Sequence, residues 1–117
     1  MRDSALKSKS FAFAIRIYNL SEFLKKEHRE FVLSRQLLRS GTAVCALVRE
    51  AEFAESLRDF IHKLSIGVKE INESIYWIEL LHAVECLNAD QFKSINSDAV
   101  ELVKILVSSI KTSKSKL

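Results

Sequence analysis

The sequence predicts an all-α protein, and three observations lead to this class. The chain has 117 residues, 48% of them hydrophobic and 28% charged, with no proline and only two glycines. Sheets and barrels need turn residues at every reversal of the chain, and this sequence has too few of them. Apolar residues instead recur at the three- and four-residue spacing of helices. The length is that of one domain, residues 1–117.

The first two predicted helices span about residues 10–26 and 31–52. The first helix has two apolar stripes, one of Phe13, Ile17, Leu20 and Leu24 and the other of Phe11, Ile15, Tyr18 and Phe23. The second helix has its main apolar positions at Leu33, Leu37, Val44, Leu47, Val48 and Ala51. A charged run, Lys25 to Glu30, forms the connection between them.

The last two predicted helices span about residues 56–87 and 96–112. Their apolar stripes include Leu57, Leu64, Ile71 and Ile78 in the third helix and Val103, Leu106 and Ile110 in the fourth. Asn88-Ala89-Asp90 is a polar break, and Asp98 with Glu101 three residues later is typical of a capped helix start. Four helices with short connections predict an antiparallel up-down-up-down bundle.

The second and third helices should face each other in a hairpin that turns near residue 54. In that register Gly41 lies opposite Gly67, which predicts a close approach of the two helix backbones at one level. The same register places Arg39 opposite Glu70 and Glu73, and Arg49 near Asp59. Because the second helix has no acidic residue from Phe31 to Arg49, we expect these five charged residues to form a structural ion-pair network. Ligand binding by Arg39 is the alternative.

The apolar surface exceeds what a single copy of the chain needs. The first and third helices each have two apolar stripes, whereas a helix of a four-helix monomer buries one. Large exposed apolar patches usually mark sites of association. The sequence therefore predicts a homo-oligomer.

The formal net charge is +3, and it is unevenly distributed. Residues 1–58 carry eleven Lys and Arg against seven Asp and Glu, whereas residues 59–117 carry seven against eight. A nucleic-acid interface in this chain would use the basic residues Lys7, Lys9, Arg16, Arg35, Lys111, Lys114 and Lys116. A ring of subunits would repeat this basic face, and phosphate contacts add up. The alternative is that the basic tail is only a solvated chain end.

Catalytic and metal-binding patterns are weak in this sequence. Glu79-Leu80-Leu81-His82 has the spacing of a carboxylate–histidine metal motif, but its imitation at Asp59 and His62 lies on the same helix, about 200° away around the axis. We therefore expect no metal, no cofactor and no enzymatic activity. Arg58 with His62 is one residue short of the Arg–His motif in helical ribonuclease domains of the HEPN type, which this architecture resembles.

The cysteines and the hydropathy indicate where the chain resides. Cys45 and Cys86 lie in apolar helical patterns without the spacing of a metal or redox site, so we expect two buried thiols. No secretory signal or membrane-spanning stretch is expected. The predicted location is the cytoplasm, without contact with a membrane.

Six segments of the chain carry a resemblance to a known family: Ser10 to Ile17, Arg29 to Thr42, Val48 to Glu52, Asp59 to Ile66, Glu73 to Leu81 and Ile110 to Thr112. In this order they resemble the bacterial four-helix bundle protein family, which includes proteins encoded in the intervening sequences of 23S ribosomal RNA genes. The resemblance implies an antiparallel four-helix bundle that assembles as a ring-shaped homopentamer, with no established enzymatic activity. A similar bundle is an accessory protein of diversity-generating retroelements, where a basic pentamer binds nucleic acid and a reverse transcriptase.

The chain departs from the pattern of this family after Thr42. The family usually has Ser-Ile-Gly-Ala-Asn-Ile there, whereas this chain has Ala43-Val44-Cys45-Ala46-Leu47-Val48. Apolar residues replace the serine and the asparagine, so a role tied to that asparagine does not carry over.

The leading functional hypothesis is a non-enzymatic, oligomeric helical bundle that binds RNA or an RNA-bound partner through a repeated basic face. A protein-interaction scaffold without nucleic-acid contact is the second hypothesis. A ribonuclease centred on Arg58 and His62 is the third.

Overall fold

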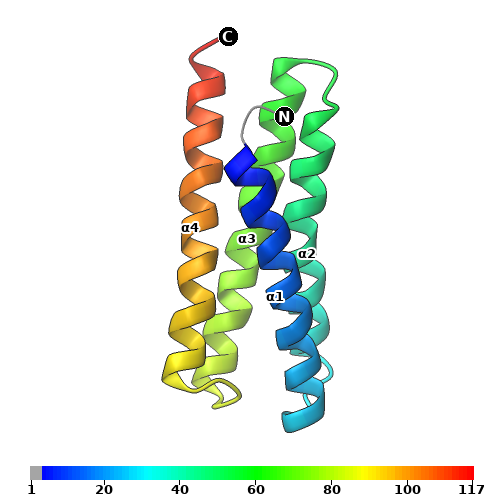
Figure 1. Cartoon of the computed structure of the whole chain (residues 1–117), viewed down its shortest axis with the longest axis vertical. Helices are drawn as coiled ribbons and strands as arrows, with labels where there is room; N and C mark the ends of the chain where they lie inside the picture. Colours follow the sequence, from blue (N-terminus) through cyan, green and yellow to red (C-terminus); the bar gives the residue numbers. More distant parts are fainter. Residues whose placement is uncertain (1–3) are drawn as a thin grey trace.

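The computed structural model describes residues 4–117, which form four α-helices packed as an elongated bundle (Figure 1). The helices are α1 (Ser4–His28), α2 (Leu33–Glu52), α3 (Leu57–Ala83) and α4 (Ala89–Lys114), and the described residues contain no strand. The prediction of an all-α protein with four helices is confirmed. None of these helices is long and apolar enough to cross a membrane.

Each helix of the bundle packs on two neighbours. α1 lies against α2 and α4, and α3 lies against the same two helices from the other side. The α1–α2 and α3–α4 connections lie at one end of the bundle, whereas the α2–α3 connection and the C-terminus lie at the other (Figure 1). Because the first helix, α1, also contacts the last helix, α4, the four helices surround one core.

The core follows the predicted apolar stripes of α1, α2 and α3, whereas of the predicted α4 stripe only Leu106 is fully buried, and Val103 and Ile110 are half-buried. It includes Leu6, Phe13, Ile17 and Leu24 of α1, Leu37, Val44 and Val48 of α2, Leu64, Ile71, Ile78 and Leu81 of α3, and Ile95, Ala99, Leu102 and Leu106 of α4. Burying a large aliphatic or aromatic side chain typically contributes about 1.5–3 kcal/mol, so this set is the main source of stability.

Small polar residues lie between α2 and α3 where large ones would keep the helices apart. The hydroxyls of Ser40 and Ser74 are 2.8 Å apart and both residues are completely buried. Ser74 Oγ also donates to the carbonyl of Glu70 at 3.0 Å. These bonds satisfy two polar groups that would otherwise destabilise the core.

The start of α1, the end of α3 and the start of α4 differ from the prediction. α1 begins at Ser4 rather than near residue 10, and Leu6 extends the core by two further turns. α4 begins at Ala89 rather than near residue 96, because Asn88 caps it in a capping box with Gln91. α3 ends at Ala83, four residues earlier than predicted, and Glu85 takes a positive φ of 67° in the connection that follows.

The predicted contact between Gly41 and Gly67 is wrong. A Cβ built on Gly41 would lie 2.8 Å from two carbons of Ile17, so this glycine serves the approach of α1 to α2. A Cβ on Gly67 would meet Leu106 of α4 at 3.8 Å. Gly41 therefore faces α1 and Gly67 faces α4, so the two glycines do not face each other.

Candidate nucleic-acid interface

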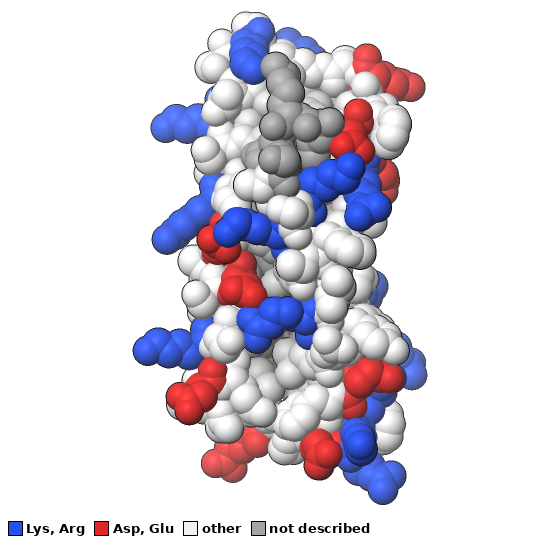
Figure 2. Space-filling model, in the orientation of Figure 1, with Lys and Arg blue, Asp and Glu red and all other residues white. Residues whose placement is uncertain are grey.

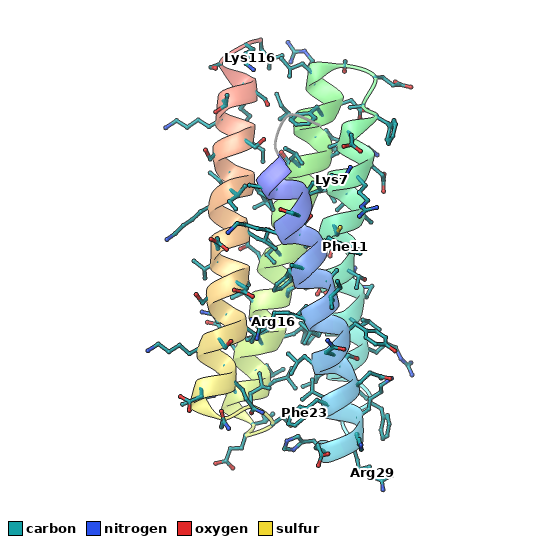
Figure 3. The ribbon with its side chains drawn as sticks, viewed as in Figure 1. Lys7, Phe11, Arg16, Phe23, Arg29 and Lys116 are labelled. Atoms are coloured by element: carbon teal, nitrogen blue, oxygen red, sulfur yellow. The ribbon has the colours of Figure 1, made fainter. Side chains whose placement is uncertain are left out.

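The three predicted basic residues of α1 are all engaged with carboxylates. The ion pairs are Lys7–Glu52 at 3.3 Å, Lys9–Glu101 at 2.8 Å and Arg16–Asp98 at 2.6 Å. The guanidinium of Arg16 also donates to the Ser94 hydroxyl at 3.0 Å. Figure 3 shows Lys7 and Arg16 along α1, and Figure 2 shows acidic side chains next to basic ones over this part of the molecule.

These ion pairs connect α1 to α2 through Glu52 and to α4 through Glu101 and Asp98. Solvent screens these partly exposed pairs, so they contribute little to stability and act mainly on the surface charge. The hydrogen bond from Lys7 lowers the pKa of the Glu52 carboxyl. Cations neutralised in this way are poor candidates for contact with phosphates.

The other predicted basic residues have no such partners. Arg35 of α2, together with Lys111, Lys114 and Lys116 at the C-terminal end, is exposed and makes no ion pair within residues 4–117. Figure 3 places Lys116 at the top of the bundle, just beyond α4. The structure therefore divides the predicted basic residues into a neutralised group on α1 and an unpaired group elsewhere.

Two further lysines join the unpaired group on α4. Lys93 and Lys104 are exposed and without an ion pair in the described part of the chain. Lys93, Lys104 and Lys111 are eleven and seven residues apart, which places them within about 20° of one another around the helix. Basic side chains project along the edge of the molecule where α4 lies (Figure 2). We call Lys93, Lys104 and Lys111 the α4 lysine stripe.

Sequence reasoning missed this stripe because the predicted fourth helix began near residue 96 and left Lys93 outside it. The spacing of eleven and seven residues was the signal that would have identified it, since both are close to whole numbers of helical turns.

Arg39 lies between α2 and α3, against the two glutamates that the hairpin register placed opposite it. Its Nη1 is 3.2 Å from Glu70 Oε1, and its Nη2 is hydrogen-bonded to Glu73. Trp77 Nε1 also donates to Glu73 at 3.0 Å. The hydrogen bond from Arg39, followed by that from Trp77, lowers the pKa of the Glu73 carboxyl. Arg39 therefore links α2 to α3, and the carboxylates of Glu70 and Glu73 balance its charge.

Arg49 does not pair with Asp59 as the sequence predicted. Its guanidinium carbon lies 5.0 Å from the centre of the Phe11 ring of α1, a cation–π contact. Asp59 belongs instead to the first turn of α3, where its carboxylate accepts a hydrogen bond from the Glu55 amide at 3.2 Å. Within residues 4–117 no ion pair joins the two, because each charge is directed toward a different partner.

The residues of the ribonuclease and metal hypotheses do not form a site with other groups. Arg58 and His62 are both exposed on α3, and their side chains make no hydrogen bond among the described residues. The part of the chain covered by the structure has no group of three His, Cys, Asp or Glu that would hold a metal ion. His82 instead stacks on Phe92 with ring centres 4.5 Å apart.

The two cysteines are free thiols among residues 4–117. Cys45 is buried in α2, and Cys86 is half-buried in the α3–α4 connection. Burial, followed by the nearby charge of Glu30, raises the pKa of the Cys86 thiol. A raised pKa keeps this thiol protonated and therefore a weak nucleophile.

The two apolar stripes of α1 have different environments. Phe13, Ile17 and Leu24 are buried in the core. Of the second stripe, Phe23 packs against the core, whereas Phe11, Ile15 and Tyr18 are 50%, 48% and 54% exposed. We call these three residues the α1 apolar stripe, and Figure 3 shows Phe11 at its upper end. Such a surface on a charged bundle is a candidate for contact with another protein chain.

Comparisons with known proteins identify a matching family and a solved structure with a similar fold. The family model of the 23S rRNA-intervening sequence protein matches residues 2–108. The fold is similar to the crystal structure of a protein with unknown function from the S23 ribosomal protein family of Bacteroides thetaiotaomicron VPI-5482, with a TM-score of 0.90 and 53% sequence identity over 91% of this chain and 98% of that chain. No curated protein matches the sequence. The chain belongs to the 23S rRNA-intervening sequence protein family.

Proposed function

We propose that this protein is a non-enzymatic helical bundle that assembles into a ring-shaped homo-oligomer and binds RNA or an RNA-bound partner. In this proposal the bundle is antiparallel, with up-down-up-down connections, and it acts through a basic face that each subunit contributes.

The observation that carries the proposal is the separation of neutralised from unpaired cations. Lys7, Lys9 and Arg16 face carboxylates, whereas the lysines of α4 and of the C-terminal end have no acidic partner within the described residues. Unpaired lysines on one side of a small bundle create a positive potential that attracts polyanions. Repetition of that side around a ring multiplies the number of phosphate contacts.

Assembly is supported by the α1 apolar stripe. About half of the surface of Phe11, Ile15 and Tyr18 is exposed in a single copy. Covering these side chains would remove apolar surface from water at roughly 25 cal/mol per Å². A second copy of the chain that covers the stripe is the simplest way to gain this free energy.

A filter-binding titration tests the proposal. The purified protein is titrated against a structured RNA at about 50 mM and 200 mM salt, and we expect binding that weakens steeply between the two concentrations. An affinity weaker than millimolar, or one that does not change with salt, would remove RNA from the proposal.

A protein-interaction scaffold is the second candidate function, and the α1 apolar stripe favours it. Such a scaffold would bind its partner through Phe11, Ile15 and Tyr18 and would not need the cations. Charge reversal at Arg35, Lys111 and Lys114 would then leave partner binding intact. Substitution of Tyr18 by a polar residue would abolish it. The opposite pattern supports the RNA-binding function.

A further inference from the structure

The α4 lysine stripe has a geometry suited to an extended, rigid partner. Lys93 and Lys111 are eighteen residues apart on one straight helix, which corresponds to roughly 27 Å along its axis. Lys104 lies between them on the same side. A helix holds these three charges in a line, whereas a disordered tail would not.

α4 has three carboxylates, and only Asp90, in the first turn and three residues before Lys93, makes no ion pair among the described residues. The two acidic residues in its central part, Asp98 and Glu101, are turned toward α1 and engaged by Arg16 and Lys9. Lys104 and Lys111 therefore carry uncompensated charge on the outward side of the helix, and Lys93 has Asp90 as its neighbour one turn earlier. The exposed Ser97 and Ser108 lie beside the stripe and make no side-chain hydrogen bond among the described residues, so their hydroxyls are free to donate to phosphate oxygens.

The stripe has no aromatic ring on which a base would stack. The only aromatic residue of α4 is Phe92, which is half-buried and stacked on His82. On the neighbouring α3, Tyr76 already lies against Trp77 with ring centres 4.8 Å apart. Proteins that bind single strands combine a basic groove with stacking platforms, whereas double-stranded RNA hides its bases and is bound through its backbone.

We infer that the α4 lysine stripe binds the phosphate backbone of double-stranded RNA without reading its sequence. This inference rests on the proposed function and narrows the RNA to its double-helical form. Lys93, Lys104 and Lys111 contact phosphates of the duplex, and Ser97 and Ser108 add hydrogen bonds beside them. Arg35, on α2, is not part of this surface.

The test compares three proteins with two probes. The probes are a 20-base-pair RNA duplex and one of its own strands, chosen to be unstructured. The stripe variant is Lys93→Gln, Lys104→Gln and Lys111→Gln, and the control variant is Lys26→Gln, Arg58→Gln and Lys69→Gln. All six residues are exposed and lack ion pairs within residues 4–117. Each variant therefore loses three positive charges, and neither changes a residue of the core. Circular dichroism and light scattering confirm that the fold and the mass are unchanged.

We expect the wild-type protein to bind the duplex at least tenfold more tightly than the single strand. The stripe variant should lose at least tenfold in duplex affinity at low salt, and its salt slope should fall by about two to three per bound subunit. The control variant should lose less than threefold.

Two outcomes contradict the inference and are distinguishable. If the wild-type protein binds RNA but prefers the single strand, or if the two variants lose equally, the duplex inference is wrong and the proposed function stands. If the wild-type protein binds neither probe in a salt-dependent way, both fail together.

Discussion

Gly41 of α2 packs directly on Ile17 of α1, with room for a hydrogen and for nothing larger. A Cβ on this glycine would lie 2.8 Å from both Cγ1 and Cγ2 of Ile17, and Ile17 is completely buried. A branched side chain in a helix has one strongly preferred rotamer, so Ile17 has little freedom to move aside. The contact sets how closely the first two helices approach each other.

The first prediction compares alanine at the two glycines. Gly41→Ala should destabilise the protein by about 1–2 kcal/mol, because overpacking against Ile17 outweighs the gain in helix propensity. Gly67→Ala should be neutral or stabilising by up to about 1 kcal/mol, since its nearest neighbour would be Leu106 at 3.8 Å. Urea unfolding at one fixed protein concentration measures both. Equal effects of the same sign would show that the α1–α2 approach is not limited by Gly41.

The second prediction concerns the acid sensitivity of the Arg39–Glu73 contact. The hydrogen bond from Arg39 lowers the pKa of Glu73 in the folded protein. A lowered folded-state pKa means that the contribution is present above the ordinary glutamate pKa of about 4.3 and is lost as the pH falls below it. Glu73→Gln should therefore reduce the free energy of unfolding at pH 7, by less than about 1 kcal/mol because the pair is partly exposed.

The measurement is the difference in unfolding free energy between wild type and variant from pH 7 to pH 3. This difference should shrink as the pH falls. Glu79→Gln on the same helix is the control, since Glu79 is exposed and makes no ion pair within the described residues. A constant difference across the range, or an equal one for the control, would mean that the Glu73 charge does not stabilise the fold.

The sequence was sufficient for the fold class because the helical spacing of buried residues is local information. Phe13, Ile17 and Leu24 mark the inner side of α1 without any knowledge of its neighbours. The hairpin register likewise placed Arg39 opposite Glu70 and Glu73, with which it lies in the structure. The same register wrongly placed Gly41 opposite Gly67, because a small residue gives no sign of which neighbouring helix it faces.

The surface charges were harder to predict because ion pairs join residues that are distant in the sequence. Lys9 meets Glu101, and Arg16 meets Asp98, only after α1 has packed on α4. No local pattern reports such a meeting, so the basic residues of α1 were predicted to be available when they are not. Arg49 was misassigned for the same reason, since its ring partner Phe11 lies on another helix.

The third prediction tests the capping box that begins α4. Asn88 Oδ1 accepts from the Gln91 amide at 2.8 Å, and the Asn88 amide donates to Gln91 Oε1 at 2.8 Å. Asn88→Ala removes the first bond and should destabilise the protein by about 1 kcal/mol, whereas Asn88→Asp should cost much less. Thermal unfolding by circular dichroism measures both. Unchanged stability of the alanine variant would mean that the first turns of α4, including Lys93, do not depend on this cap.

The fourth prediction tests whether a second copy covers the α1 apolar stripe. Ile15 lies at its centre and is 48% exposed, so a charge there is compatible with the isolated bundle. A buried carboxylate without a partner is costly, so Ile15→Glu should dissociate the proposed oligomer while the helical content is retained. Gln36→Glu, an exposed position on α2, introduces the same charge away from the stripe and should leave the mass unchanged. Light scattering at several concentrations measures the mass. An Ile15→Glu protein with the mass of the wild-type assembly would place the subunit contact on another surface, since no interface that buries Ile15 would accept that carboxylate at neutral pH.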